Sequence, residues 1–187
     1  MLPYGFAVST VRGLVRVLSA GLLAFVLFDP GAGSAQEVKQ IKLTERHVQN
    51  FIAAHEEMTK LYEGVDPEKP DPKLTAQAEA IAKKNGFVRL DEHAIVTMNI
   101  LMVMSGIDPQ TKQFTEPPEQ IRRQIAALKE DKFVPETEKK QVLAQLEAAL
   151  KNTRPIQFKE NIALVLKYFD KLAPLMQEQD SELRPAD

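Results

Sequence analysis

The stretch IVTMNILMVM, residues 95–104, decides the fold. Thr97 and Asn99 are its only polar residues, so a helix through this stretch is apolar on almost every side. Such a helix has to be covered on every side by other elements. We therefore predict a central buried helix that begins with Asp91 as its N-cap and ends at Gly106.

Five more segments show the 3.6-residue period of amphipathic helices, and proline, glycine or a capping residue bounds most of them. These segments are predicted as helices from Thr44 to about Glu63, from Asp71-Pro72 to Asn85, from Pro117-Pro118 to about Lys129, from Pro135 or Glu136 to a break at 152–155, and from about Phe158 onward. No segment has the two-residue period of a strand. The predicted fold class is therefore all-α, a compact bundle of about six helices with a central apolar helix.

The last two predicted helices carry more specific expectations. The inward side of the fifth is predicted to hold the apolar residues Val142, Leu143, Leu146, Ala149 and Leu150. Pro174 lacks the amide hydrogen that continues a helix, so it is predicted to end or kink the sixth. The polar residues 177–187 are predicted to form a flexible tail. Residues 36–176 are then expected to form a single helical domain.

The N-terminal residues have the three parts of a secretory signal peptide. Arg12 and Arg16 precede the uncharged apolar run VLSAGLLAFVLF at residues 17–28, and small residues follow up to Ala35. The run is shorter than the roughly 20 residues that span a bilayer. We expect export by the general secretory route and cleavage near Ala35, which gives a periplasmic protein without stable membrane insertion. The alternative is an uncleaved anchor helix.

Composition excludes several classes of function. The chain has no cysteine, which rules out a thiol nucleophile, a thiolate metal site, a lipoprotein anchor and a c-type haem attachment. It contains 24 Lys+Arg and 26 Asp+Glu. Residues 1–35 hold two arginines and one aspartate, so the remainder has a net charge of −3. Because it has no basic excess, nucleic acid is not an expected partner.

Histidine and methionine are the only candidate metal ligands beyond carboxylates. His47 and His55 lie eight residues apart, which is too far for the i, i+4 geometry of a shared ion, and His93 lies on another helix. Met98 and Met102 are at i, i+4 and could bind Cu(I) together with His93. The alternative is that His55 and the methionines fill an apolar core. We assign no metal site or cofactor and keep His93, Met98 and Met102 as weak candidates.

No catalytic residues are assigned. The paired carboxylates, which include Asp91 and Glu136, are explained by helix N-termini and solvated faces. Gly-x-Ser-x-Gly, phosphate-loop and dinucleotide-binding motifs are absent from the sequence. The string SGIDPQTK at 105–112 is predicted to form a turn in which Asp108 bonds the backbone ahead. That turn either sets the angle between two helices or forms a recognition surface.

Three strings in this chain suggest a family. With AIAKKNGF at 80–87, LDE at 90–92 and GIDPQTK at 106–112, the chain resembles uncharacterised small exported helical proteins of alphaproteobacteria. The resemblance implies a periplasmic location and a helical fold, and it implies no known active site. A looser likeness, through LTE at 43–45, is to periplasmic chaperones of the Spy and CpxP type. The repeated Leu-Thr-x-x-Gln signature of those chaperones is missing here.

These observations favour a non-enzymatic protein. The first hypothesis is a periplasmic protein-binding or chaperone-like module whose partner is another periplasmic protein or an unfolded chain. This hypothesis needs an apolar patch on the surface of the folded chain. The alternatives are a carrier that holds a small apolar ligand between helices and, after it, a copper-handling protein. The sequence leaves the oligomeric state open.

Overall fold

A computed structural model describes residues 39–65 and 71–182 of the chain. The helices are α2 (Glu45–Tyr62), α3 (Pro72–Lys84), α4 (Leu90–Met104), α5 (Pro117–Glu130), α6 (Glu136–Asn152) and α7 (Glu160–Glu182). These described ranges contain no strand, only an isolated antiparallel bridge between Ile107 and Phe114. The all-α prediction with six helices is confirmed. The predicted signal peptide, residues 1–35, lies outside the described residues.

The described chain divides into two compact units. One unit is Pro117–Arg154 and contains α5 and α6. The other contains α2, α3, α4 and α7, from the residues up to Glu116 and those from Pro155 onward. The division falls at Pro117 and Pro155, next to two of the breaks read from the sequence. The expectation of one domain over 36–176 concerns the two units together, and it stays a prediction.

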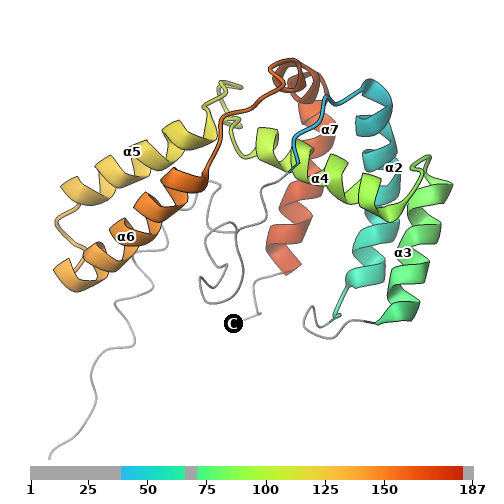
Figure 1. The fold of residues 1–187 in the computed structure, drawn as a ribbon, viewed down its shortest axis with the longest axis horizontal. Coiled ribbons are helices and arrows are strands. Elements are labelled where there is room, and N and C mark those ends of the chain that lie inside the picture. The colour runs from blue at the N-terminus through green and yellow to red at the C-terminus, as the bar shows by residue number, and fades with distance from the viewer. Residues whose placement is uncertain (1–38, 66–70, 183–187) are drawn as a thin grey trace, which may run out of the picture. The chain divides into compact units, whose positions relative to one another are not determined.

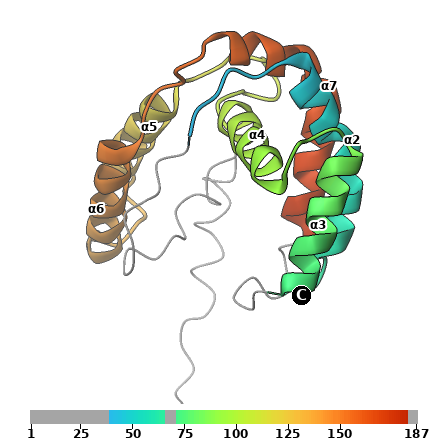
Figure 2. The same cartoon turned by 45° about the vertical axis from the view of Figure 1, so that its right-hand side comes forward.

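In the four-helix unit, α2 lies between α3 and α7, and α4 runs across them (Figures 1 and 2). Apolar residues at helical spacing build the core where these helices meet. Its most buried side chains include Val48, Val96, Ile100, Val165 and Leu172. This agrees with the apolar faces read from the sequence, because each helix turns its i, i+3, i+4 stripe toward the others.

Two helices begin where local rules placed them. The Thr44 hydroxyl accepts a bond from the His47 amide (3.2 Å), and His47 Nδ1 accepts one from the Thr44 amide (3.3 Å), which completes a capping box. Asp71 Oδ1 accepts a bond from the Lys73 amide (2.8 Å), with Pro72 in the first turn. Each cap satisfies amide groups that the helix leaves unpaired.

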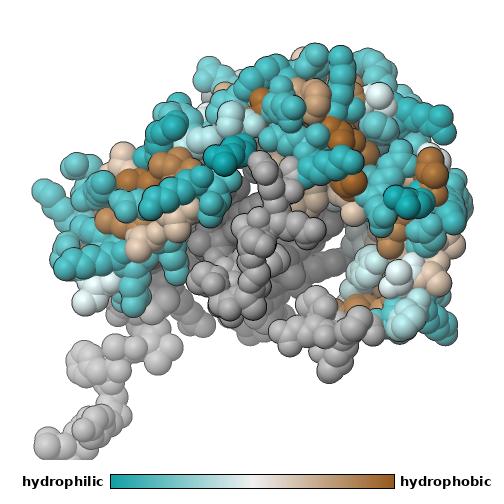
Figure 3. Space-filling view, viewed as in Figure 1, coloured by the Kyte–Doolittle hydropathy of each residue, from teal (hydrophilic) through white to brown (hydrophobic). Residues whose placement is uncertain are grey.

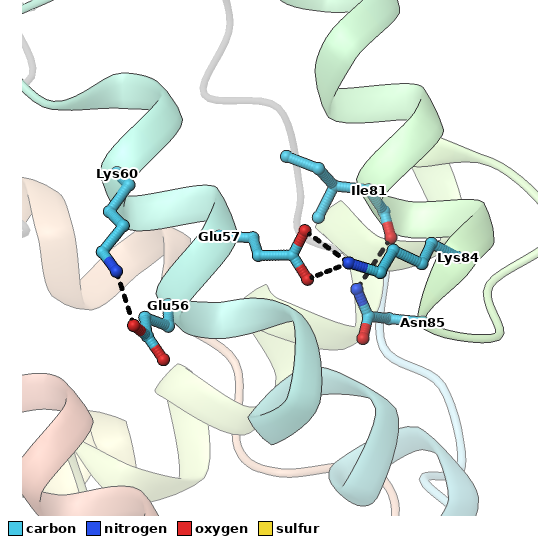
Figure 4. Close-up of polar contacts among 6 residues, drawn as sticks. All are labelled: Glu56, Glu57, Lys60, Ile81, Lys84 and Asn85. Carbon is cyan, nitrogen blue, oxygen red and sulfur yellow. Dashed lines mark hydrogen bonds and ion pairs between the residues drawn. The ribbon is translucent and has the colours of Figure 1, made fainter.

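An ion pair joins α2 to the C-terminal end of α3, and an asparagine side chain caps that end. Lys84 of α3 donates to both carboxylate oxygens of Glu57 on α2, at 2.9 and 3.0 Å (Figure 4). Asn85 Nδ2 donates to the Ile81 carbonyl at 3.0 Å. The pair of Glu56 and Lys60 stays within α2. All these charged side chains are exposed, so each pair adds little stability.

The start of α4 differs from the prediction that Asp91 is its N-cap. The N-cap is Arg89, which forms no side-chain cap bond. Instead, the amide of Leu90 donates to Glu79 of α3 at 2.7 Å, and the amide of Val88 donates to Glu92 at 2.6 Å. A carboxylate from a neighbouring helix thus acts as the cap, and the helix starts two residues earlier than predicted. At the other end the helix stops at Met104, two residues before Gly106.

The prediction that other elements cover α4 on every side is also wrong. Its buried residues are Val96, Asn99, Ile100 and Val103, all on one side. Ile95, Met98 and Leu101 are only half-buried. The contacts of α4 with α2, α3 and α7 explain the buried side, because those helices reach it from one direction.

Two asparagines pin an extended segment, Lys39–Leu43, onto the helices. Asn161 Oδ1 accepts a bond from the Leu43 amide and its Nδ2 donates to the Ile41 carbonyl, both at 2.8 Å. Asn99 Oδ1 accepts from the Ile41 amide at 3.0 Å, and its Nδ2 donates to the Lys39 carbonyl at 2.9 Å. Both asparagines are 2% exposed. Buried amide groups of this kind need partners, and the backbone of the segment supplies them.

The last helix does not end at Pro174. It continues to Glu182, so residues 177–182 of the predicted flexible tail are helical, and 183–187 lie outside the described residues. Pro174 removes one backbone hydrogen bond at a cost of about 3 kcal/mol. Leu175 and Met176, beyond the proline, pack against the core. Their burial favours continuation of the helix past the proline.

Candidate functional site

The weak metal candidates lie along α4, and the first of them, His93, lies among aromatic rings. The His93 ring stacks on Phe51, with 6.3 Å between centroids, and meets the edge of Phe87 at 5.1 Å. Its Nε2 atom is buried without a hydrogen-bond partner. Burial and then the nearby His55 lower the pKa of His93 from 6.5, so this imidazole is neutral at pH 7.

The other two histidines have contacts of their own at the interface of α2 with α4. His55 is buried on α2 with its ring 5.6 Å from that of Phe51. His47 uses Nδ1 in its capping box, and its Nε2 lies 3.9 Å from Glu92. Over residues 39–65 and 71–182, no three His, Asp or Glu side chains are grouped so that they could hold a metal ion. The geometry places His55 and His93, but not His47, in an aromatic cluster with Phe51.

The methionines of α4 divide between the core and the surface. Met102 and Met104 pack against the core of the four-helix unit. Met98 is half-buried on the side of α4 that the core does not cover. In this arrangement Met102 fills the core as a flexible apolar side chain does.

The carboxylates are surface groups held by cations. Asp91 lies 3.2 Å from Arg89, and Glu136 lies 3.1 Å from Lys139. Hydrogen bonding from Lys167, then from Tyr168, lowers the pKa of Glu45. A general acid needs a raised pKa near neutrality, and the contacts of Glu45 shift its pKa in the opposite direction.

The loop at 105–112 forms the predicted turn. Asp108 Oδ1 accepts bonds from the Thr111 amide (2.7 Å), the Thr111 hydroxyl (3.0 Å) and the Gln110 amide (3.0 Å), and these bonds lower the pKa of Asp108. Lys112 has a positive φ of 58° and its ammonium group lies 3.6 Å from the centroid of the Phe169 ring. The same ammonium group lies 2.8 Å from Asp170. These contacts attach the loop to α7, which agrees with the interpretation that it orients helices.

The hairpin of α5 and α6 has an apolar surface that the sequence did not single out. Ile121, Leu128, Val134 and Leu146 are buried between the two helices, and Ile125, Leu143, Ala149 and Leu150 are partly buried around them. Apolar side chains gather along α5 and α6 between hydrophilic margins (Figure 3). The prediction that Val142 points inward is wrong, since this residue is 37% exposed. Within the hairpin α6 packs against one helix, α5. One helix covers a narrower stripe of α6 than the several neighbours of a bundle would cover.

Phe133 stands at the tip of this hairpin. It is 90% exposed, the highest value among the large apolar side chains that the structure describes as exposed. The Asp131 carboxylate accepts bonds from the amides of Phe133 (2.7 Å) and Val134 (3.3 Å), which fixes the turn. Val134 next to it is buried, so the turn has one apolar side chain inward and one outward. Phe133 lies between two predicted helices and outside any periodic segment, so the sequence pattern gave no signal for this arrangement.

Comparison with known proteins gives no relatives to guide the assignment. No protein-family model matches the chain, and neither a curated protein nor a solved structure matches it. No helix in the described ranges combines the length and apolar character that crossing a membrane requires.

The surface of the hairpin around Phe133 is the candidate site that the geometry offers.

Proposed function

We propose that this protein is a non-enzymatic, chaperone-like binding module of the periplasm that holds apolar segments of unfolded chains on the α5–α6 hairpin. One observation carries this proposal: Phe133, a large aromatic side chain, is 90% exposed on a turn that its neighbours hold in place. Aromatic side chains of this kind supply a large share of the energy at protein interfaces. The periplasmic location rests on the signal-peptide pattern in the sequence.

The energetics agree with weak, reversible binding. Full burial of a Phe side chain is worth about 1.5–3 kcal/mol, which is a modest gain for one bound segment. Lys132 next to Phe133 is exposed and keeps the tip hydrated when no chain is bound. An apolar site rimmed by charge binds many sequences without strong selectivity.

The test is an aggregation assay on protein purified after expression of the full sequence. Reduced α-lactalbumin serves as the unfolded chain, and light scattering reports its aggregation. The protein is expected to slow aggregation, and Phe133→Ser is expected to lose most of this effect without a change in thermal stability. Val88→Ser is the matched control, since Val88 is 73% exposed but belongs to the four-helix unit.

Two results would contradict the proposal. The first is a wild-type protein that leaves aggregation unchanged at a molar excess. The second is equal loss of protection by Phe133→Ser and Val88→Ser, which would show that the hairpin tip has no special part in binding.

A further inference from the structure

The exposed side of α6 has a charge pattern that is complementary to itself. One exposed side carries four of the six charged residues of α6, Glu136, Lys140, Glu147 and Lys151, spaced four, seven and four positions apart; Glu138 and Lys139 lie off this side. Because a helix has 3.6 residues per turn, these spacings keep all four on one side. The signs of the charges alternate along the helix. The midpoint of the four positions lies between Leu143 and Ala144, and residues at equal distances on either side of it carry opposite charges.

This symmetry determines how two copies of α6 can meet. In an antiparallel pair related by a two-fold axis through that midpoint, Glu136 lies opposite Lys151 of the second copy, and Lys140 lies opposite Glu147. Each contact occurs twice, as in any interface between two identical surfaces. A parallel pair in register would place like charges opposite each other, which disfavours that arrangement.

Apolar residues run along the same side of the helix. Leu143 and Leu150 are half-buried and alternate with the charged residues at spacings of three and four: Glu136, Lys140, Leu143, Glu147, Leu150. Spacings of three and four are those by which one helix packs along another. α5 does not use this side fully, since neither leucine is fully buried in the hairpin.

Three of these four charged side chains are available for contacts between copies. Glu136 with Lys140, and Glu147 with Lys151, have the i, i+4 spacing of intrahelical ion pairs. Neither pair forms: Glu136 contacts Lys139 instead. Among the residues that the structure describes, Lys140, Glu147 and Lys151 have no ion-pair partner, and all three are exposed.

We propose that the protein self-associates through this side of α6, with α6 helices of two copies packed antiparallel and joined by four ion pairs around Leu143 and Leu150. The partner is a second copy of this chain because the pattern complements itself at each of these four charged positions. The proposed function is tested at Phe133 at the tip of the hairpin, whereas this proposal is tested at the charged residues of α6, so failure of one is distinguishable from failure of the other.

The experiment is sedimentation equilibrium of the protein, purified after expression of the full sequence, over a range of concentrations and at low and high salt. A monomer–dimer equilibrium is expected, and its dissociation constant should rise with salt because exposed ion pairs are screened. Lys140→Glu should raise the dissociation constant at least about tenfold, since it places a carboxylate opposite Glu147 twice in each dimer.

The reversed pair provides the decisive comparison. The double variant Lys140→Glu/Glu147→Lys restores opposite charges across the interface and should return the dissociation constant to near the wild-type value. Lys129→Glu on α5 is the control with the same change in charge and should leave the equilibrium unchanged. Circular dichroism of each variant shows whether it folds.

Three results would overturn the proposal. One is a protein that stays monomeric at low salt up to the highest concentration reached. Another is a double variant that associates as weakly as Lys140→Glu alone. The third is a Lys129→Glu control that weakens association as much as Lys140→Glu.

Discussion

Asn161 is the residue whose replacement tests the architecture of the four-helix unit most directly. Its side chain bonds the Leu43 amide and the Ile41 carbonyl, both at 2.8 Å, and the residue is 2% exposed. Asn161→Ala removes the side chain that bonds these two backbone groups, and it leaves the Leu43 amide hydrogen and the Ile41 carbonyl unsatisfied. Each such group costs about 1–3 kcal/mol, so we expect a loss of about 3 kcal/mol in the free energy of unfolding.

The assay is urea and thermal unfolding followed by circular dichroism. A loss of about 3 kcal/mol corresponds to a fall of about 6–12 °C in Tm for a chain of this size. Gln40→Ala is the control, because Gln40 also bonds backbone groups, the Pro155 carbonyl and the Gln157 amide, but at the surface. Water replaces those bonds, so the control should lose under about 1 kcal/mol.

A second variant separates lost hydrogen bonds from lost volume. Asn161→Asp keeps the shape and the acceptor for the Leu43 amide, but a carboxylate cannot donate to the Ile41 carbonyl. It should therefore also destabilise the protein at pH 7. Two results would contradict this reasoning. One is a loss of unfolding free energy in Asn161→Ala no larger than in Gln40→Ala. The other is an Asn161→Asp variant as stable as the wild type.

Three more predictions concern single residues. Gly106→Ala should lower the free energy of unfolding by about 1–3 kcal/mol or more, since the new Cβ would lie 2.3 Å from the Phe114 ring. Chemical unfolding measures this loss, and an unchanged unfolding midpoint would contradict the close packing at Gly106. Thr44→Ala should cost about 1 kcal/mol by removing the cap on the His47 amide, as thermal unfolding would show, whereas Thr44→Ser should cost less. His93 has a pKa lowered mainly by burial, so the unfolded chain binds its proton more readily and stability is lost as pH falls below about 6.5. Unfolding at pH 8 and pH 5 should therefore show a smaller acid loss in His93→Gln than in the wild type, and equal losses would mean that His93 is not responsible.

Sequence rules succeeded where the relevant interaction is local. The caps at Thr44 and Asp71 depend on side chains within three residues of the amide they bond, and both occur as predicted. At α4 the same rules chose Asp91 as the cap. The carboxylate of Glu79, eleven residues before Leu90 and on another helix, takes the amide of Leu90 instead.

The candidate site shows the same division. The aromatic cluster around His93 comes from residues on different elements, and sequence spacing did not predict it. The apolar surface of the hairpin depends on how much of α6 its neighbour covers, which periodicity does not specify. Periodicity gives the direction of an apolar stripe, and only the packed structure gives the fraction of that stripe that is buried.

By itself the sequence determined the all-α class, the number of helices and most of their ends, because period, proline and capping act within one or two turns of helix. Only the tertiary structure decided that Asn99 and Asn161 hold the segment before α2, that α7 runs on past Pro174, and that one side of α4 stays half-exposed. The physical reason is distance along the chain. The bond from Leu43 to Asn161 joins residues 118 positions apart, and the burial that carries α7 beyond its proline comes from helices far away in sequence.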